Sequence, residues 1–269
     1  MKYKIAFLGT PNFAAQILEQ LIGTGFEPQL VITGQDKKSG RSQALKASAV
    51  KLAAKKHNIA ISYKLDDLDK SFDIAILAAY GKIIPDKILS IPKFGFVNVH
   101  PSLLPKYRGP SPITSAILNG DKQTGVTLIV LDSELDHGPQ IAQEELTTAE
   151  TDNHETLTLK LAQIGSKLLL KTLPQYLAQN ITPIPQNHEL ATYTEKIAKD
   201  SGKIDINNPP DKLALDRMIR AYFPWPGVWF EQDDKKFKLL PGTITDSPTY
   251  RLTDLPTHRS SSNRKGKNQ

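Results

Sequence analysis

The stretch Ile74-Ala-Ile-Leu-Ala78 is apolar at every position. A strand with one face in water alternates apolar and polar residues, whereas a uniform run is typical of a strand in a parallel sheet covered on both faces. Helical patterns separate this run from its neighbours, which predicts an α/β fold with a doubly wound, mostly parallel sheet. The neighbouring predicted strands are residues 3–8, 30–32, 59–61 and 96–100.

Two helices stand out between and after these strands. The first strand turns through Gly9-Thr10-Pro11 into a helix from Asn12 to about residue 22, and we expect Thr10 to cap it. Residues 154–177 repeat leucine at helical spacing, as in a helix packed on a core. The first turn lacks the G-x-G-x-x-G pattern, and no phosphate-binding loop occurs elsewhere, so a nicotinamide or ATP site is not supported.

Asn98 and His100 are two residues apart on the predicted strand 96–100, so both point to the same face of the sheet. Asp136 follows the apolar run 125–131, and we expect it to reach the same edge of the sheet. An amide N–H and a protonated imidazole can donate to a developing oxyanion, and a carboxylate can fix which ring nitrogen carries the proton. The three residues therefore suit chemistry at a carbonyl carbon.

Two other interpretations of this motif stay open. A histidine on a strand is more often a core or edge residue than a catalytic one. Ser102 lies close to His100, but it stands in no G-x-S-x-G pattern, which disfavours a serine hydrolase. The segment after the strand holds three prolines and Gly109, which predicts a rigid loop of the kind that carries binding groups.

Composition limits the class of protein. The 269 residues include no cysteine, and the six histidines show no H-E-x-x-H spacing, so we expect a mechanism without a metal. No apolar run is long enough to span a membrane and no leader pattern is present, so we expect a cytoplasmic protein.

Positive charge is concentrated rather than spread. Seven lysines and arginines face one aspartate within residues 35–56, and four of the +6 net charges lie in the last twelve residues. The segment 35–56 is either a solvated loop and helix face or a contact to a phosphate backbone.

The chain divides by composition. We predict a first domain over 1–178, a polar, proline-containing linker over 179–195, a second domain over 196–257 and a disordered basic tail over 258–269. Trp225 and Trp229 in the second domain are candidates for a stacking platform or for its core.

Seven segments resemble the methionyl-tRNA formyltransferase family, within the wider group of enzymes that use 10-formyltetrahydrofolate. The first and the last two are specific to the tRNA enzymes, and the others are shared by the wider group. The seven segments are Phe7-Leu-Gly-Thr-Pro-Asn-Phe13, Asn98-Val-His-Pro-Ser-Leu-Leu-Pro105, Tyr107-Arg-Gly-Pro110, Gly125-Val-Thr127, Leu135-Asp-His-Gly138, Ala191-Thr-Tyr-Thr-Glu-Lys-Ile197 and Ala221-Tyr-Phe-Pro-Trp-Pro-Gly227.

The resemblance implies transfer of a formyl group from 10-formyltetrahydrofolate to the α-amine of methionyl-initiator tRNA, without a metal and by a monomer. It implies a Rossmann-like catalytic domain and a smaller OB-like barrel that binds tRNA and is truncated in this chain. The implied catalytic residues are Asn98, His100 and Asp136. The implied folate contacts are Ser102, Leu103, Leu104 and Pro105, and the implied tRNA contacts are Lys37, Lys38, Arg41 and Lys46.

Two alternative functions remain open. They arise from related enzymes of the wider group and from departures of this sequence from the family pattern. One is a folate-dependent formyltransferase that acts on a small amine, such as glycinamide ribonucleotide or an amino sugar. The other is a tRNA-binding module that lost catalysis together with its barrel, because the second domain is short. The basic loop is also poorer in lysine and proline than is usual in the family, so we expect a softer grip on tRNA.

Overall fold

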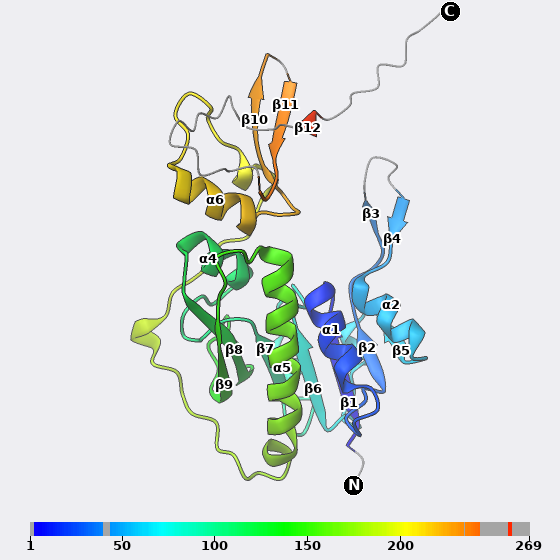
Figure 1. Ribbon diagram of the computed structural model, residues 1–269. Coiled ribbons are helices and arrows are strands. Elements are labelled where there is room, and N and C mark those ends of the chain that lie inside the picture. Colours follow the sequence, from blue (N-terminus) through cyan, green and yellow to red (C-terminus); the bar gives the residue numbers. More distant parts are fainter. Residues whose placement is uncertain (1–2, 40–43, 234, 243–257, 260–269) are drawn as a thin grey trace, which may run out of the picture.

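A seven-stranded sheet forms the centre of the first domain in the computed structural model, which describes residues 3–39, 44–233, 235–242 and 258–259 (Figure 1). Its spatial order is β5-β2-β1-β6-β7-β8-β9, with parallel pairing from β5 to β7 and antiparallel pairing of β8 and β9. The predicted mostly parallel α/β sheet is confirmed. The strands are β1 (Ile5–Gly9), β2 (Leu30–Ile32), β5 (Ala60–Ser62), β6 (Ile74–Ala78), β7 (Phe96–His100), β8 (Gln123–Val130) and β9 (Gln140–Thr147).

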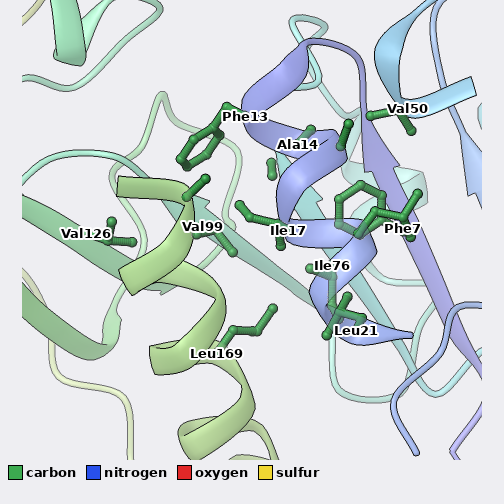
Figure 2. Close-up of a cluster of buried hydrophobic side chains, with 14 of the residues drawn as sticks. Phe7, Phe13, Ala14, Ile17, Leu21, Val50, Ile76, Val99, Val126 and Leu169 are labelled. Atoms are coloured by element: carbon green, nitrogen blue, oxygen red, sulfur yellow. The ribbon is translucent and has the colours of Figure 1, made fainter. Parts of the chain in front are cut away.

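Helices cover one face of this sheet, and α1 and α5 lie side by side across it (Figure 1). The buried cluster beneath them joins Phe7, Ile76 and Val99 of the strands to Ile17 of α1 and Leu169 of α5 (Figure 2). Removal of these apolar side chains from water is the main force that holds the layers together. The helices are α1 (Asn12–Leu21), α2 (Ala49–Lys56) and α5 (His154–Leu177).

The opposite face is covered by the short elements η1 (Leu65–Asp67) and α3 (Asp86–Leu89) and the segments around them. Phe96 of β7 belongs to this second buried cluster, whereas Val97 and Val99 belong to the cluster under the helices. Successive side chains on a strand alternate between faces. Asn98 and His100 therefore lie on the face of Phe96, away from α1 and α5.

Local structure differs from the expectation at two places. The N-cap of α1 is Pro11, and among the described residues no side chain caps this helix; the Thr10 hydroxyl donates instead to the Tyr80 carbonyl at 3.4 Å. Part of the basic segment is not a plain loop, because β3 (Lys37–Ser39) and β4 (Ala44–Lys46) form a hairpin. One strand, β9, was not predicted, because it is an edge strand whose polar, partly exposed sequence lacks the apolar signal of a buried strand.

A smaller unit lies beyond the helix α4 (Pro112–Asn119), against which α6 (Lys212–Ala221) packs (Figure 1). It contains a three-stranded antiparallel sheet of β10 (Val228–Gln232), β11 (Lys235–Leu239) and β12 (His258–Arg259). Its buried cluster includes Leu215, Ile219, Val228 and Phe230. This is compatible with the predicted smaller second domain. The short helices η2 (His188–Leu190) and η3 (Lys199–Gly202) precede it in the chain.

The two tryptophans of this unit differ. Trp229 is 5% exposed and carries the Lys236 ammonium 3.0 Å from its ring centre, whereas Trp225 is 60% exposed. The predicted disordered tail, apart from β12, lies outside the described residues. Within the described part of the chain, no helix is long and apolar enough to cross a membrane.

Candidate active site

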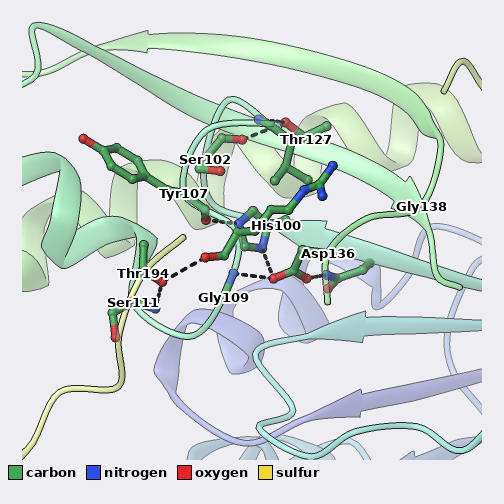
Figure 3. A network of polar contacts seen from close by, with 12 residues as sticks. His100, Ser102, Tyr107, Gly109, Ser111, Thr127, Asp136, Gly138 and Thr194 are labelled. Carbon is green, nitrogen blue, oxygen red and sulfur yellow. Dashed lines mark hydrogen bonds and ion pairs between the residues drawn. The ribbon is translucent and has the colours of Figure 1, made fainter. Parts of the chain in front are cut away.

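The three predicted catalytic residues meet in the structure. Asn98 and His100 of β7 are 5% and 4% exposed. The Asn98 amide donates to Oδ1 of Asp136 at 3.2 Å. Oδ2 of Asp136 lies 3.6 Å from Nδ1 of His100 (Figure 3). A carboxylate only accepts hydrogen bonds, so the Asn98 amide must present its NH₂ group to Asp136. The arrangement brings a buried amide, a buried imidazole and a partly buried carboxylate into one cluster.

The hydrogen bonds of His100 fix one of its two ring protons. Its Nε2 lies 2.9 Å from the carbonyl oxygen of Tyr107, and a carbonyl can only accept, so Nε2 carries a proton. The other ring nitrogen, Nδ1, faces Asp136. A second proton on Nδ1 makes the ring an imidazolium held between a carbonyl and a carboxylate, which is a stabilising position for that cation.

Tyr107 is held at both ends, and this aims its carbonyl at His100. Its φ of +63° is left-handed, and its N–H donates to the Thr192 hydroxyl at 2.9 Å. At the far end of the side chain, the phenol donates to Asp121 at 2.8 Å and accepts from Asn119 at 2.7 Å. Burial is the main cause that raises the pKa of Tyr107, so the phenol stays protonated as a donor.

Asp136 reaches the cluster by a different route from the one expected. Because β8 runs antiparallel to β7, its end at Val130 pairs with Val97, near the start of β7. The following loop folds back and closes with the Val130 N–H on the Pro139 carbonyl at 2.9 Å. Gly138 permits this closure, since a Cβ there would lie 1.8 Å from the Val130 oxygen. The loop, rather than a shared strand end, delivers Asp136.

Gly109 is a site residue whose role the sequence did not reveal. Its backbone N–H donates to Asp136 Oδ2 at 2.8 Å, a shorter contact to that carboxylate than either the Asn98 amide or the His100 ring makes. Its φ is +106°, and a Cβ would lie 2.9 Å from the Thr194 carbonyl oxygen. Both facts favour glycine at this position. Gly109 therefore permits the turn of the loop and also supplies the N–H that binds Asp136.

The second half of the predicted linker packs against the site. We call residues 184–194 the strap. Its backbone pairs with Gln140 through Ile184 and with Arg108 through Thr192 and Thr194. The Thr194 hydroxyl also accepts from the Ser111 N–H at 3.0 Å (Figure 3). The polar composition of residues 184–190 is that of a loop and does not distinguish them from a free linker, whereas residues 191–194 belong to the family-like segment 191–197.

The segment predicted to border folate is internally bonded. The Ser102 side chain is buried and donates to the Lys106 carbonyl at 2.6 Å. Leu104 is buried, and its carbonyl accepts from the side-chain amides of Gln140 and Gln143 at 2.9 and 3.0 Å. Leu103 and Pro105 are half-buried. Folate contact by these four residues stays a prediction.

The basic segment separates into two parts. Lys51 and Lys56 of α2 form ion pairs with Asp36 and Glu19, at 2.7 and 3.2 Å. The predicted tRNA contacts Lys37 and Lys46 are exposed on the hairpin and are register partners. Lys38 belongs to β3, and Arg41 lies outside the described residues.

Comparisons with known proteins identify the class. The family model described as "Formyl transferase" matches residues 3–173, and "Formyl transferase, C-terminal domain" matches residues 196–253. An N-formyltransferase from Helicobacter canadensis has a TM-score of 0.67 at 21% identity, covering 91% of this chain and 89% of its own. A 4-N formyltransferase from Francisella tularensis has a TM-score of 0.70 at 22% identity, covering 89% and 97%. Fold and family models together define a formyl transferase.

Sequence relatives narrow the class. A methionyl-tRNA formyltransferase from Chloroflexus aurantiacus is 40% identical over 84% of this chain and 75% of its own length. One from Enterococcus faecalis is 37% identical over 91% and 82%. The chain belongs to the methionyl-tRNA formyltransferase family.

Proposed function

We propose that this protein transfers the formyl group of 10-formyltetrahydrofolate to the α-amine of methionyl-initiator tRNA and so makes the formylmethionyl-tRNA that starts translation. The observation that carries the proposal is the convergence of Asn98 and His100 on Asp136. It occurs in a chain 37–40% identical to enzymes named for that substrate.

The polar groups suit a formyl carbonyl, which accepts hydrogen bonds and gains negative charge when it is attacked. An amide NH₂ carries two N–H groups, and Asn98 uses one of them on Asp136. We assign the second to the formyl oxygen. A donor fixed in a buried site stabilises the oxyanion without having to reorganise, and one such donor contributes roughly 10²- to 10³-fold in rate.

We assign the transfer of the proton from the amine to the folate nitrogen to His100 and Asp136. An α-amine ordinarily has a pKa of about 7.7 to 8, so a useful fraction is neutral near pH 7 and needs no strong base. As the bond from the amine nitrogen to the formyl carbon forms, the amine loses a proton, and the departing folate nitrogen must gain one. Nδ1 of His100 carries that proton, and Asp136 stabilises the imidazolium.

The proposal also assigns contacts with the tRNA and with the formyl donor. Lys37, Lys38 and Lys46 of the hairpin contact the tRNA backbone, together with Arg41 of the same basic segment, and residues 196–257 form a second tRNA-binding domain. Residues 102–105, next to His100, border the folate. Because one chain supplies every residue of the site, we propose that a monomer acts, in the cytoplasm where initiator tRNA is used.

A competition between amines tests this function. The purified protein is incubated with 10-formyltetrahydrofolate carrying a labelled formyl group and with methionyl-initiator tRNA, glycinamide ribonucleotide or a nucleotide-linked amino sugar. We expect label on methionyl-tRNA alone. Label on a free amine would replace the proposal with a small-amine transferase, and tRNA binding without transfer would replace it with a binding module.

A further inference from the structure

Gln186, in the strap, is a buried amide whose side chain makes four hydrogen bonds. It is 5% exposed. Its Nε2 donates to the carbonyl oxygens of Asp136 and Gly138, both at 2.8 Å. Its Oε1 accepts from the Arg108 guanidinium at 2.7 Å from Nη2 and 3.2 Å from Nε. Two N–H donors and two oxygen lone pairs are the full capacity of an amide, so every polar position of this side chain is used.

These bonds act on the residue whose placement matters most. Asp136 has a φ of +47°, a left-handed conformation that residues other than glycine adopt rarely and that persists only where the surroundings enforce it. Gly109 and Asn98 hold its carboxylate. Gln186 holds its backbone carbonyl. The side chain and the main chain of Asp136 are thus fixed by different partners.

The same amide links the two loops of the site. Arg108 precedes Gly109, which donates to Asp136, and Gln186 bonds Arg108 on one side and the Asp136 loop on the other. The Arg108 guanidinium also donates to His188 Nδ1 at 2.8 Å and to the Tyr193 hydroxyl at 3.3 Å, both from the strap. A displacement of the strap would therefore displace both the Arg108 loop and the Asp136 loop.

We propose that Gln186 is a positioning residue for catalysis: by donating to the Asp136 carbonyl it keeps the Asp136 carboxylate against Gly109, Asn98 and His100. The proposal rests on the proposed catalytic role of Asp136 and goes beyond it, because Gln186 itself touches neither His100 nor the reacting atoms. It also gives the strap a function, which is to hold the Arg108 loop and the Asp136 loop together.

Gln186→Glu separates positioning from simple anchoring. Glutamate has nearly the same shape, and its carboxylate pairs with the Arg108 cation, so the strap stays attached. An ionised carboxylate cannot donate, so the carbonyls of Asp136 and Gly138 lose their partner. Since a misplacement of about 1 Å at a reacting group costs on the order of 10²-fold, we expect kcat to fall about 10²-fold. We expect KM for tRNA and for folate to change less than about 2-fold.

Two controls accompany this variant. Asn187→Ala changes the adjacent, exposed strap residue, whose side chain accepts only from the Glu189 N–H among the described hydrogen bonds, and we expect wild-type kcat. Gln186→Met removes the donors and the acceptor together, and we expect it to lose kcat as Gln186→Glu does and to unfold at a lower temperature. Wild-type kcat in Gln186→Glu overturns the proposal, and so does a failure of both Gln186 variants to fold.

A double-mutant cycle tests whether Gln186 acts through Asp136. In an Asp136→Asn background, adding Gln186→Glu should change kcat by less than about 3-fold, because residues that act as a unit are not additive. A full additional 10²-fold loss overturns the proposal, since it would show an effect that bypasses Asp136.

A readout without substrate keeps this test separate from the proposed function. The Gly109 N–H is bonded to Asp136, so its hydrogen exchange, followed by NMR, reports the position of the carboxylate. We expect at least 10-fold faster exchange in Gln186→Glu and no change in Asn187→Ala. Unchanged exchange overturns the positioning role, whichever amine the wild-type enzyme formylates.

Discussion

The Asp136 loop and the β3–β4 hairpin both lie outside the central sheet of the first domain, and they are built in opposite ways. Asp136 receives bonds from a strand, from a glycine N–H and from the strap, and its side chain is 12% exposed. The hairpin has two strands of three residues that pair with each other, and Leu45 within it is 71% exposed.

The difference reflects what each region has to do. Chemistry at a carbonyl carbon requires donors fixed to a fraction of an ångström, which dense, mutually supporting hydrogen bonds provide. Contact with a long phosphate backbone requires charge and reach, and attraction between exposed charges tolerates imprecise geometry. We therefore expect changes near Asp136 to affect turnover, and changes on the hairpin to affect affinity.

The largest effect is expected from removing the donors themselves. Asn98→Ala and His100→Ala should each lower the single-turnover rate by roughly 10²- to 10³-fold. The first variant removes a fixed donor to the oxyanion, and the second removes the group that carries the proton. The affinity of both variants for tRNA, measured by filter binding, should equal that of the wild type. Near-normal single-turnover rates in either variant would contradict the assigned roles.

Gly109→Ala should have the next largest effect. A methyl group would lie 2.9 Å from the Thr194 oxygen at a φ of +106°, so the loop has to move and the N–H shifts away from Asp136. We expect turnover to fall about 10- to 10²-fold, with a lower melting temperature. Gly23→Ala is a matched control, since that glycine also has a positive φ (+76°) but no heavy atom within 4 Å of its Cβ position. It should lose stability without losing turnover.

The hairpin should behave in the opposite manner. Lys37→Ala with Lys46→Ala should weaken tRNA binding and lower the slope of log affinity against log salt by on the order of 2, one for each lost phosphate contact. Turnover at saturating tRNA should stay normal. Lys167→Ala with Lys171→Ala, on an exposed side of α5, removes the same charge and should leave the slope unchanged. Equal slopes for the two double variants would refute the hairpin assignment.

The smallest effect on activity is expected at Asp152, a buried carboxylate before α5. Burial alone raises its pKa, but hydrogen bonds from Lys160, the Ala149 N–H and Thr156 outweigh it and hold the pKa below 3.8. A pKa lowered on folding stabilises the protein above the unfolded value, and that stability is lost as pH falls through the folded pKa.

Asp152→Asn should therefore lower the free energy of unfolding at pH 7 by about 1.5–3 kcal/mol and leave turnover unchanged. In urea unfolding, the difference in the free energy of unfolding between this variant and the wild type should narrow as the pH falls below 3.8. The exposed Glu150→Gln variant, which loses a solvent-screened ion pair with Lys122, should leave the free energy of unfolding nearly unchanged. A gap that is independent of pH would contradict this account.

Elements with a strong periodic signal could be predicted from the sequence. Residues 154–177 form one helix with the predicted bounds, and 74–78 form the buried strand, because hydrophobic periodicity directly reflects which faces are covered. The alternation of side chains along a strand also predicted that Asn98 and His100 lie on the same face of the sheet. That each lies near Asp136 was predicted, although the path of the chain to Asp136 was not.

What the sequence could not give depends on backbone hydrogen bonds. The Gly109 N–H, the Tyr107 carbonyl and the folding back of the Asp136 loop involve groups that every residue carries, so no residue type marks them. Gln186 stands in a polar, proline-containing stretch whose composition is that of a linker. Only its contacts with Asp136 and Arg108 distinguish it from a solvated amide.

The place of the strap along the chain bears on how the protein matures on the ribosome. Each strand of the central sheet and the long helix that ends at Leu177 precede Gln186, so the layered first domain is free to fold while the strap is still inside the exit tunnel. A nascent chain at that stage holds Asn98 and His100 on their strand without the amide that fixes Asp136. Formylating activity should therefore appear during synthesis later than the fold does.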